Sequence, residues 1–105
     1  LSKPTDGSDP SWFGFPITIK ESSAVKRVDL VKYLDQFKIG TRLLFAGSLI
    51  NQPYFQDVEY RISGELPNTE RTMTQTFWLG VQPTLDEEHY DFVAGKLEEF
   101  FGVGF

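Results

Sequence analysis

Two hydrophobic periodicities alternate along this chain. Apolar residues that alternate, or cluster in short β-prone runs, predict three strands, at residues 12–20, 41–46 and 77–81. Apolar residues spaced every three or four positions, with one weaker polar segment between them, predict three helices, at residues 26–38, 68–76 and 84–102. Because each element buries one apolar face, this order predicts an α+β two-layer domain: a small, mostly antiparallel sheet of about three strands covered by helices.

Residues with capping preferences mark the ends of these helices. The sequence Thr84-Leu85-Asp86-Glu87 is a capping box, with Thr84 as the predicted cap of the last helix. The apolar stripe of that helix includes His89 and Phe92. The other predicted caps are Ser22 or Ser23 and Asn68 at helix starts, and Gly40 and Gly102 at helix ends.

Turn-forming residues divide the chain into segments. We predict a linker at 1–11, a small domain at 12–102 and a tail at 103–105. Pro16 has no amide hydrogen, so its strand is expected at a sheet edge or a bulge, or with that position facing outward. The segments 47–57 and 58–65 are expected to form a long irregular connection. Because the first residue is Leu1 and not methionine, we expect a fragment of a longer protein. The apolar residues 100–105 would then pack on the remainder of that protein.

Charge and composition exclude several classes of function. The net charge is −5 with no basic cluster, so we expect no nucleic-acid binding. No apolar run approaches 18 residues, so we expect no membrane span. Cysteine is absent, which excludes disulfides, thiolate catalysis and cysteine-ligated metal in these residues and fits a reducing, cytoplasmic location. Ten phenylalanines predict a bulky core or an interface.

The sequence offers no complete catalytic set. There is no glycine-rich phosphate loop, and the single histidine, His89, lies on an apolar helix stripe where packing is the better interpretation. The acids at 86–88 resemble helix-start residues, and Glu98 and Glu99 resemble a solvated helix face. We therefore predict no catalytic residue, no bound cofactor and no metal ligand within this chain.

Arg42 is the charged residue most suited to binding. It lies in a short apolar strand just after a helix–glycine junction, where its guanidinium can contact a phosphate, a carboxylate or sugar oxygens, or else form a surface ion pair. The loop that contains Ser48 and Asn51 is suited either to approaching a ligand or to simple connection. For Phe13, packing in the core is a better interpretation than a position facing a ligand.

Five segments in order resemble the nucleotide-sugar aminotransferase and dehydrase family. They are SWFGFPIT at 11–18, DLVKYL at 29–34, IGTRLLFAG at 39–47, QPYF at 52–55 and QTFWLG at 75–80, followed by Pro83. The resemblance covers about residues 10–102 and is strongest to the 3-dehydrase branch of lipopolysaccharide synthesis. It implies the C-terminal small domain of a fold-type I, aspartate aminotransferase-like enzyme.

This resemblance implies a reaction and its partners. The parent enzyme would use pyridoxamine 5′-phosphate, or pyridoxal phosphate, and a [2Fe–2S] cluster to remove the C3 hydroxyl of a CDP-linked 4-keto-6-deoxyhexose for O-antigen lipopolysaccharide. A separate reductase would supply electrons, and the parent would be a homodimer with its active site between subunits. The isolated domain would be inactive and would bind none of these cofactors.

The resemblance also implies roles for individual residues. Arg42 matches an arginine that reaches toward the substrate or a cofactor adduct, and Ser48 and Asn51 would line the sugar pocket. Phe13 falls where aminotransferases often have histidine, and a phenyl ring cannot transfer protons, which favours dehydration. Gly40 stands where some related dehydrases have glutamate, so an acidic contact is not expected there. Two other interpretations stay open: the small domain of a sugar aminotransferase, and a free-standing interaction module.

Overall fold

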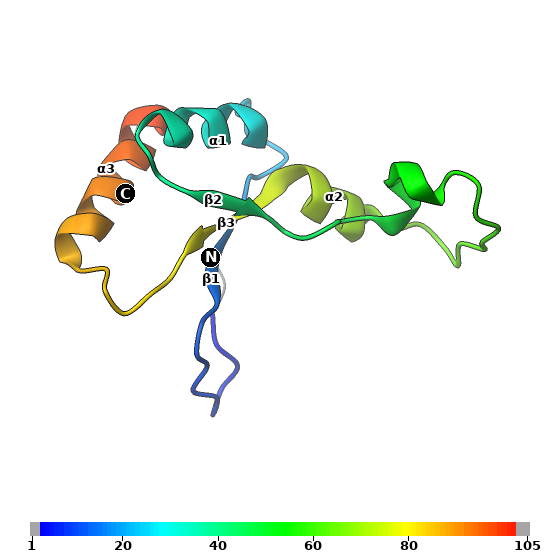
Figure 1. The fold of residues 1–105 in the computed structure, drawn as a ribbon, viewed down its shortest axis with the longest axis horizontal. Helices are drawn as coiled ribbons and strands as arrows, with labels where there is room; N and C mark the ends of the chain where they lie inside the picture. The colour runs from blue at the N-terminus through cyan, green and yellow to red at the C-terminus, as the bar shows by residue number, and fades with distance from the viewer. Residues whose placement is uncertain (1–2, 103–105) are drawn as a thin grey trace.

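A three-stranded antiparallel sheet and three helices make up the computed structural model of this chain, which describes residues 3–102 (Figure 1). The strands are β1 (Gly14–Thr18), β2 (Thr41–Leu43) and β3 (Thr76–Gly80), in the order β1-β3-β2. The helices are α1 (Arg27–Gln36), α2 (Pro67–Gln75) and α3 (Glu87–Phe101), and two 3₁₀ turns, η1 (Leu49–Asn51) and η2 (Pro53–Phe55), follow β2. The predicted α+β class and the order of elements are confirmed.

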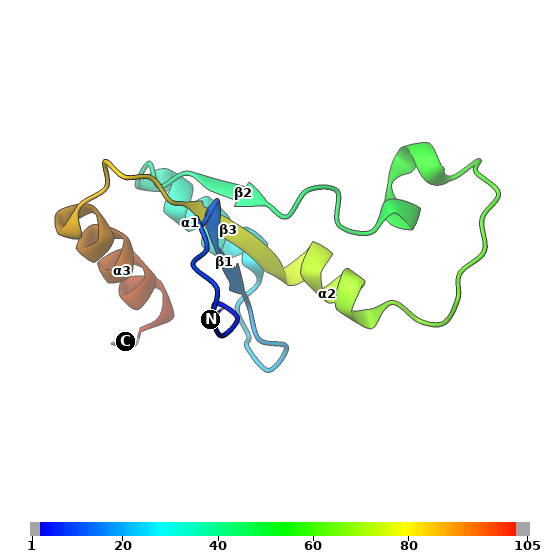
Figure 2. The same cartoon turned by 90° about the horizontal axis from the view of Figure 1, so that it is seen from below.

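The hydrophobic core lies between one face of the sheet and the helices α1 and α3 (Figures 1 and 2). Strand side chains alternate between faces, and the pairing of Ile17 with Phe77 places both on the face that packs against α1. Phe77, Leu30 and Leu34 are completely buried. Val93, Leu97, Phe100 and Phe101 of α3 close the core from the side.

β1 and β2 are shorter than the sequence pattern predicts, whereas β3 has the predicted length. β1 is an edge strand, which accommodates the missing amide hydrogen of Pro16 as expected. β2 ends at Leu43 because Phe45 adopts a left-handed backbone conformation with φ of 51°, and its amide donates a hydrogen bond to the Leu43 carbonyl at 2.8 Å. The prediction that this strand continues through Ala46 is therefore wrong.

The ends of α1 differ from the predicted caps. The helix starts after Lys26 without a side-chain cap, and the Ser23 hydroxyl instead accepts a hydrogen bond from the Val25 amide. At the other end, Lys38 adopts the left-handed conformation, with φ of 62°, in place of Gly40. The amides of Lys38 and Ile39 donate to the carbonyls of Asp35 and Leu34, which is a Schellman motif that brings Ile39 back into the core.

Replacing Lys38 with glycine is expected to stabilise this helix end. A residue with a Cβ atom is strained at positive φ, and glycine removes that strain at the cost of a more flexible unfolded chain, so the net gain is about 1 kcal/mol. Lys32→Gly in the interior of α1 is the matched control and should instead cost about 1 kcal/mol. Hydrogen exchange at the amides of 34–39 measures both; faster exchange in Lys38→Gly would contradict the prediction.

The starts of α2 and α3 also differ from the predicted caps. α2 begins at Pro67, with Leu66 as its N-cap, so Asn68 lies inside the helix. α3 is capped by Asp86 and not by Thr84: the Asp86 Oδ1 accepts a hydrogen bond from the His89 amide at 3.2 Å. A carboxylate satisfies the free amides at a helix start better than a hydroxyl two residues earlier can.

The His89 ring also binds Asp86, with its Nδ1 2.6 Å from Oδ1. The side-chain hydrogen bond and then the backbone hydrogen bond from His89 hold the pKa of Asp86 below its ordinary value of 3.8. Ionised Asp86 therefore stabilises the fold at pH values above 3.8, and this stabilisation is lost as the pH falls through the lowered pKa. An NMR titration of the Asp86 carboxyl should have its midpoint below 3.8, and His89→Ala should raise it, whereas Tyr90→Ala should not. A wild-type midpoint at or above 3.8 would contradict this.

The apolar stripe of α3 is only partly confirmed. Val93, Leu97 and the two phenylalanines at its end pack on the core, but His89 and Phe92 are exposed. The start of α3 extends beyond α1 and the sheet (Figure 2), and residues 87–92 are exposed. Residues 103–105, the predicted tail, lie outside the described residues. Phe100 and Phe101, the first two of the apolar residues 100–105, pack on this domain's own core and therefore do not need a surface from another part of the protein.

The segment between β2 and α2 projects far from the sheet (Figures 1 and 2). It contains η1 and η2, and residues 58–66 have no regular structure, as predicted. This arm raises the radius of gyration to 16.4 Å, against about 13 Å for a compact domain of this length. The accessible surface is 8475 Å², whereas a compact monomer of this size exposes about 6,000 Å². The chain therefore exposes more surface than a compact domain of the same size.

Candidate functional site

The face of the sheet that points away from α1 and α3 carries the candidate site. Gly14, Pro16 and Thr18 of β1 alternate onto this face, and their pairing with β3 places Trp78 there as well. β2 adds Arg42, which pairs directly with Trp78. We call the side of the sheet defined by these five residues the open face.

An aromatic cluster covers the middle of the open face. The rings of Phe13 and Phe45 flank Trp78, with centroids 5.1 Å and 5.4 Å from its ring. The Trp78 ring lies so close to β1 that a Cβ atom on Gly14 would come within 3.0 Å of it, which explains glycine at this position. The side chains of Phe13 and Phe45 are 79% and 81% exposed, so both rings are accessible to a ligand or to a partner surface.

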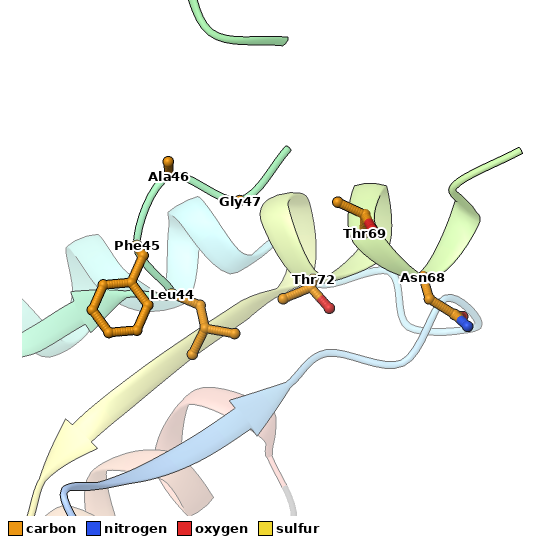
Figure 3. Close-up of a pocket in the computed structure, with 7 residues that line it drawn as sticks. All are labelled: Leu44, Phe45, Ala46, Gly47, Asn68, Thr69 and Thr72. Atoms are coloured by element: carbon orange, nitrogen blue, oxygen red, sulfur yellow. The ribbon is translucent and has the colours of Figure 1, made fainter. Parts of the chain in front are cut away.

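Two adjoining hollows border this cluster. The aromatic groove has a volume of about 450 Å³ and is lined by Trp12, Phe13, Trp78 and three threonines, at 18, 72 and 76. The loop groove has a volume of about 410 Å³ and lies between the segment 44–47 and α2 (Figure 3). Leu44 and Thr72 line both. Both are open hollows with apolar walls and a few hydroxyl groups.

The segment after β2 is firmly attached to α2. Gly47 has φ of 67° and lies where a Cβ atom would be 2.5 Å from Met73 Cγ, so only glycine fits. Gln52 Nε2 donates to the Ala46 carbonyl at 2.6 Å, and Asn51 Nδ2 donates to Glu70 at 2.7 Å. These contacts fix the backbone that carries Phe45.

The structure separates the predicted site residues into two groups. Arg42 and Phe13 lie on or beside the open face, although Arg42 lines neither groove. Ser48 is 1% exposed, and its hydroxyl has no hydrogen-bond partner among residues 3–102. Asn51 is engaged with Glu70, so its amide ties the arm to α2. A pocket role for Ser48 and Asn51 stays a prediction.

Arg27 has hydrogen-bond partners, whereas Arg42 has no ion-pair partner among residues 3–102. Arg27 Nη1 donates to the carbonyls of Met73 and Thr76 at 2.6 Å and 3.3 Å, so it joins α1 to the junction of α2 and β3. Arg42 is exposed and forms no ion pair within the part of the chain that the structure describes. The surface ion pair considered for Arg42 is therefore absent there, and its guanidinium is free to bind an anion.

Sequence reasoning missed Phe45, Trp78 and Thr72 as residues of the site. Strand alternation in 76–80 was a usable signal for Trp78, because its neighbour Phe77 has to face the core. The left-handed conformation of Phe45 had no signal, since it depends on how the following loop packs on Met73.

Metal and cofactor ligation can be tested on the described residues, 3–102. Among residues 3–102 no group of three histidine or acidic residues is placed to hold a metal ion, and the sequence has no cysteine. The two grooves are open hollows without a lysine or an enclosed polar cradle, so they do not fit a phosphorylated pyridine cofactor on their own. No helix within 3–102 is long and apolar enough to cross a membrane.

Sequence comparison defines the class of protein. Residues 1–98 match the DegT/DnrJ/EryC1/StrS aminotransferase family, and the chain belongs to this family. It is 65% identical over its whole length to the lipopolysaccharide biosynthesis protein RfbH of Salmonella typhimurium, covering 24% of that protein.

More distant relatives carry names that state an activity. The chain is 44% identical over 96 residues, 91% of its length, to the dTDP-4-dehydro-2,6-dideoxy-D-glucose 3-dehydratase of Saccharopolyspora spinosa, and covers 21% of that protein. Over 63 residues, 59% of its length, it is 36% identical to the GDP-4-keto-6-deoxy-D-mannose 3-dehydratase of Yersinia pseudotuberculosis, covering 16% of it. The chain thus spans a quarter or less of the relatives it matches.

Proposed function

We propose that this chain is the C-terminal small domain of a sugar 3-dehydrase, which removes the C3 hydroxyl of a CDP-linked 4-keto-6-deoxyhexose in lipopolysaccharide synthesis. The observation that carries the proposal is the 65% identity over all 105 residues to a lipopolysaccharide biosynthesis protein. Two further relatives are named as 3-dehydratases of nucleotide-linked deoxysugars. The open face, with an unpaired guanidinium beside exposed aromatic rings, suits a ligand that combines phosphates with rings.

The role proposed for this domain is to bind and enclose the substrate. Arg42 holds negative charge on the substrate or its adduct through charge-assisted hydrogen bonds. Phe13 and the aromatic groove exclude water and orient the ligand, and Ser48 and Asn51 shape the arm beside it. No proton-transfer group lies in either groove, so the acid–base residue is expected in the remainder of the parent protein.

The cofactors are proposed for the parent protein. Pyridoxamine phosphate and a [2Fe–2S] cluster would supply the electron sink and the single electrons for cleavage of the C3–O bond, with electrons delivered by a separate reductase. This chain lacks cysteine, so cluster ligands would come from elsewhere in the homodimeric parent. Its own residues contribute binding, orientation and closure.

The test is the reaction of the full-length protein with CDP-4-keto-6-deoxyglucose. With the reductase and NADH, we expect a product that has lost the C3 oxygen, detected by mass spectrometry, and no amino sugar when glutamate is added. The alternative, a sugar aminotransferase, is favoured by the description of the matching family. Formation of an amino sugar without loss of the C3 oxygen would establish that alternative and reject dehydration.

A further inference from the structure

Phe45 combines two features that rarely occur together. It is a bulky residue at positive φ, 51°, and its ring is 81% exposed. A side chain with a Cβ atom is strained in this conformation, and such strain persists where the surrounding structure fixes it; strained residues cluster at active sites, ligand sites and switch regions. Burial of the ring cannot be the reason for this strain, because the described chain leaves the ring uncovered.

The conformation of Phe45 is fixed from both sides. Its amide binds the Leu43 carbonyl at 2.8 Å, and the next carbonyl, that of Ala46, accepts a hydrogen bond from Gln52 at 2.6 Å. Gly47 then packs against Met73. The ring stands nearly edge-on to Trp78, at an interplanar angle of 74°, so one aromatic face is held ready for a flat ligand. Such preorganisation lowers the entropy cost of binding.

The charge beside this ring indicates what binds there. Arg42 lies on the same face as Trp78 and has no ion-pair partner within residues 3–102. Arginine and aromatic residues are also enriched at protein–protein interfaces, so the binding test has to distinguish a bound ligand from an interface with the rest of the parent protein. An aromatic platform next to a guanidinium matches a heterocyclic base linked to phosphates.

We propose that Phe45 and Trp78 form a stacking site for the base of the nucleotide that carries the sugar, with Arg42 directed to its phosphates. This inference rests on the proposed function, because it assigns the nucleotide part of that substrate to this domain. It adds Phe45 and Trp78 to the proposed binding residues. It also explains why the first residues of the arm between β2 and α2 are fixed by hydrogen bonds and by packing on α2.

Titration calorimetry on the full-length protein tests the assignment with two probes, CDP and inorganic pyrophosphate. Phe45→Leu should weaken CDP binding by about five-fold to 150-fold, because a base stacked on an aromatic ring loses about that much when the ring is removed. Pyrophosphate binding should be unchanged in this variant. Phe45→Tyr keeps the ring and should bind CDP like the wild type, whereas Arg42→Ala should weaken both probes.

Phe92→Leu is the matched control, because Phe92 is exposed on α3 and lines neither groove; it should bind both probes normally. Unchanged CDP affinity in Phe45→Leu overturns the inference, and a lower unfolding temperature with unchanged CDP affinity assigns the ring to an interface with the rest of the chain. If Phe45→Leu weakens binding of the CDP-sugar but not of CDP, the Phe45 ring contacts the sugar and not the base. If the wild type binds neither CDP nor the CDP-sugar, the proposed function fails and the inference with it.

Discussion

Replacing Arg42 with alanine in the full-length protein is expected to lower kcat/KM for the CDP-linked 4-keto-6-deoxyhexose by about ten-fold to 150-fold. A hydrogen bond to a charged group contributes about 1.5–3 kcal/mol, and this is the free energy lost from the transition-state complex. The folded protein should lose little stability, because Arg42 is exposed and has no ion pair within residues 3–102. A large kinetic effect on an unchanged fold is therefore the expected signature.

Two further variants sharpen the Arg42 experiment. Arg42→Lys keeps the charge but loses the forked geometry, so it should recover only part of the activity if two oxygens of the ligand are held together. Lys32→Ala removes an exposed cation from α1, on the other side of the sheet, and should leave kcat/KM unchanged. A change of less than about two-fold in Arg42→Ala would show that the guanidinium does not contact the substrate.

The order of elements was predictable because hydrophobic period is a local property. The alternation through Phe15 and Ile17 and the helical spacing of Leu30 and Leu34 exist in the sequence before any folding. Helix ends were predictable only in part: Gly102 ends α3 in the left-handed conformation as predicted, whereas the caps of α1 differ from the prediction. Lys38 takes the left-handed position because Ile39 has to return to the core beside Leu34, and this tertiary requirement outweighs the preference of Gly40 for that conformation.

The candidate site was predictable only in part, for a similar reason. Arg42 stands out in the sequence as a single charge among apolar neighbours, and the structure leaves it unpaired within the described chain. For Phe13, the residues alone favour core packing and only the resemblance implies a role at the site; its ring is exposed and lies against Trp78. The cluster of Phe13, Phe45 and Trp78 joins three segments distant in sequence, so its existence depends on strand register and on one left-handed residue.

The small core makes Phe77 the residue whose truncation should be most destabilising. It lies in the central strand β3, is completely buried, and contributes to a cluster that has five buried apolar residues within 3–102. Phe77→Ala should lower the free energy of unfolding by about 3–5 kcal/mol, because it loses the transfer free energy of the ring and leaves a cavity between the sheet and α1. That loss is comparable to a large part of the stability of a typical domain.

Hydrogen exchange in the full-length protein measures this loss of stability in the elements that line the cavity. Amides of α1 and β3 should exchange faster in Phe77→Ala by the factor that corresponds to the lost free energy, because these elements share the cavity. Phe92→Ala removes the same side chain from a half-exposed position on α3 and should change exchange in α1 and β3 little. Equal effects of the two substitutions would mean that the core does not lie between this sheet face and α1. The open face should keep its strand pairing in Phe92→Ala, so binding and stability can be separated within one set of variants.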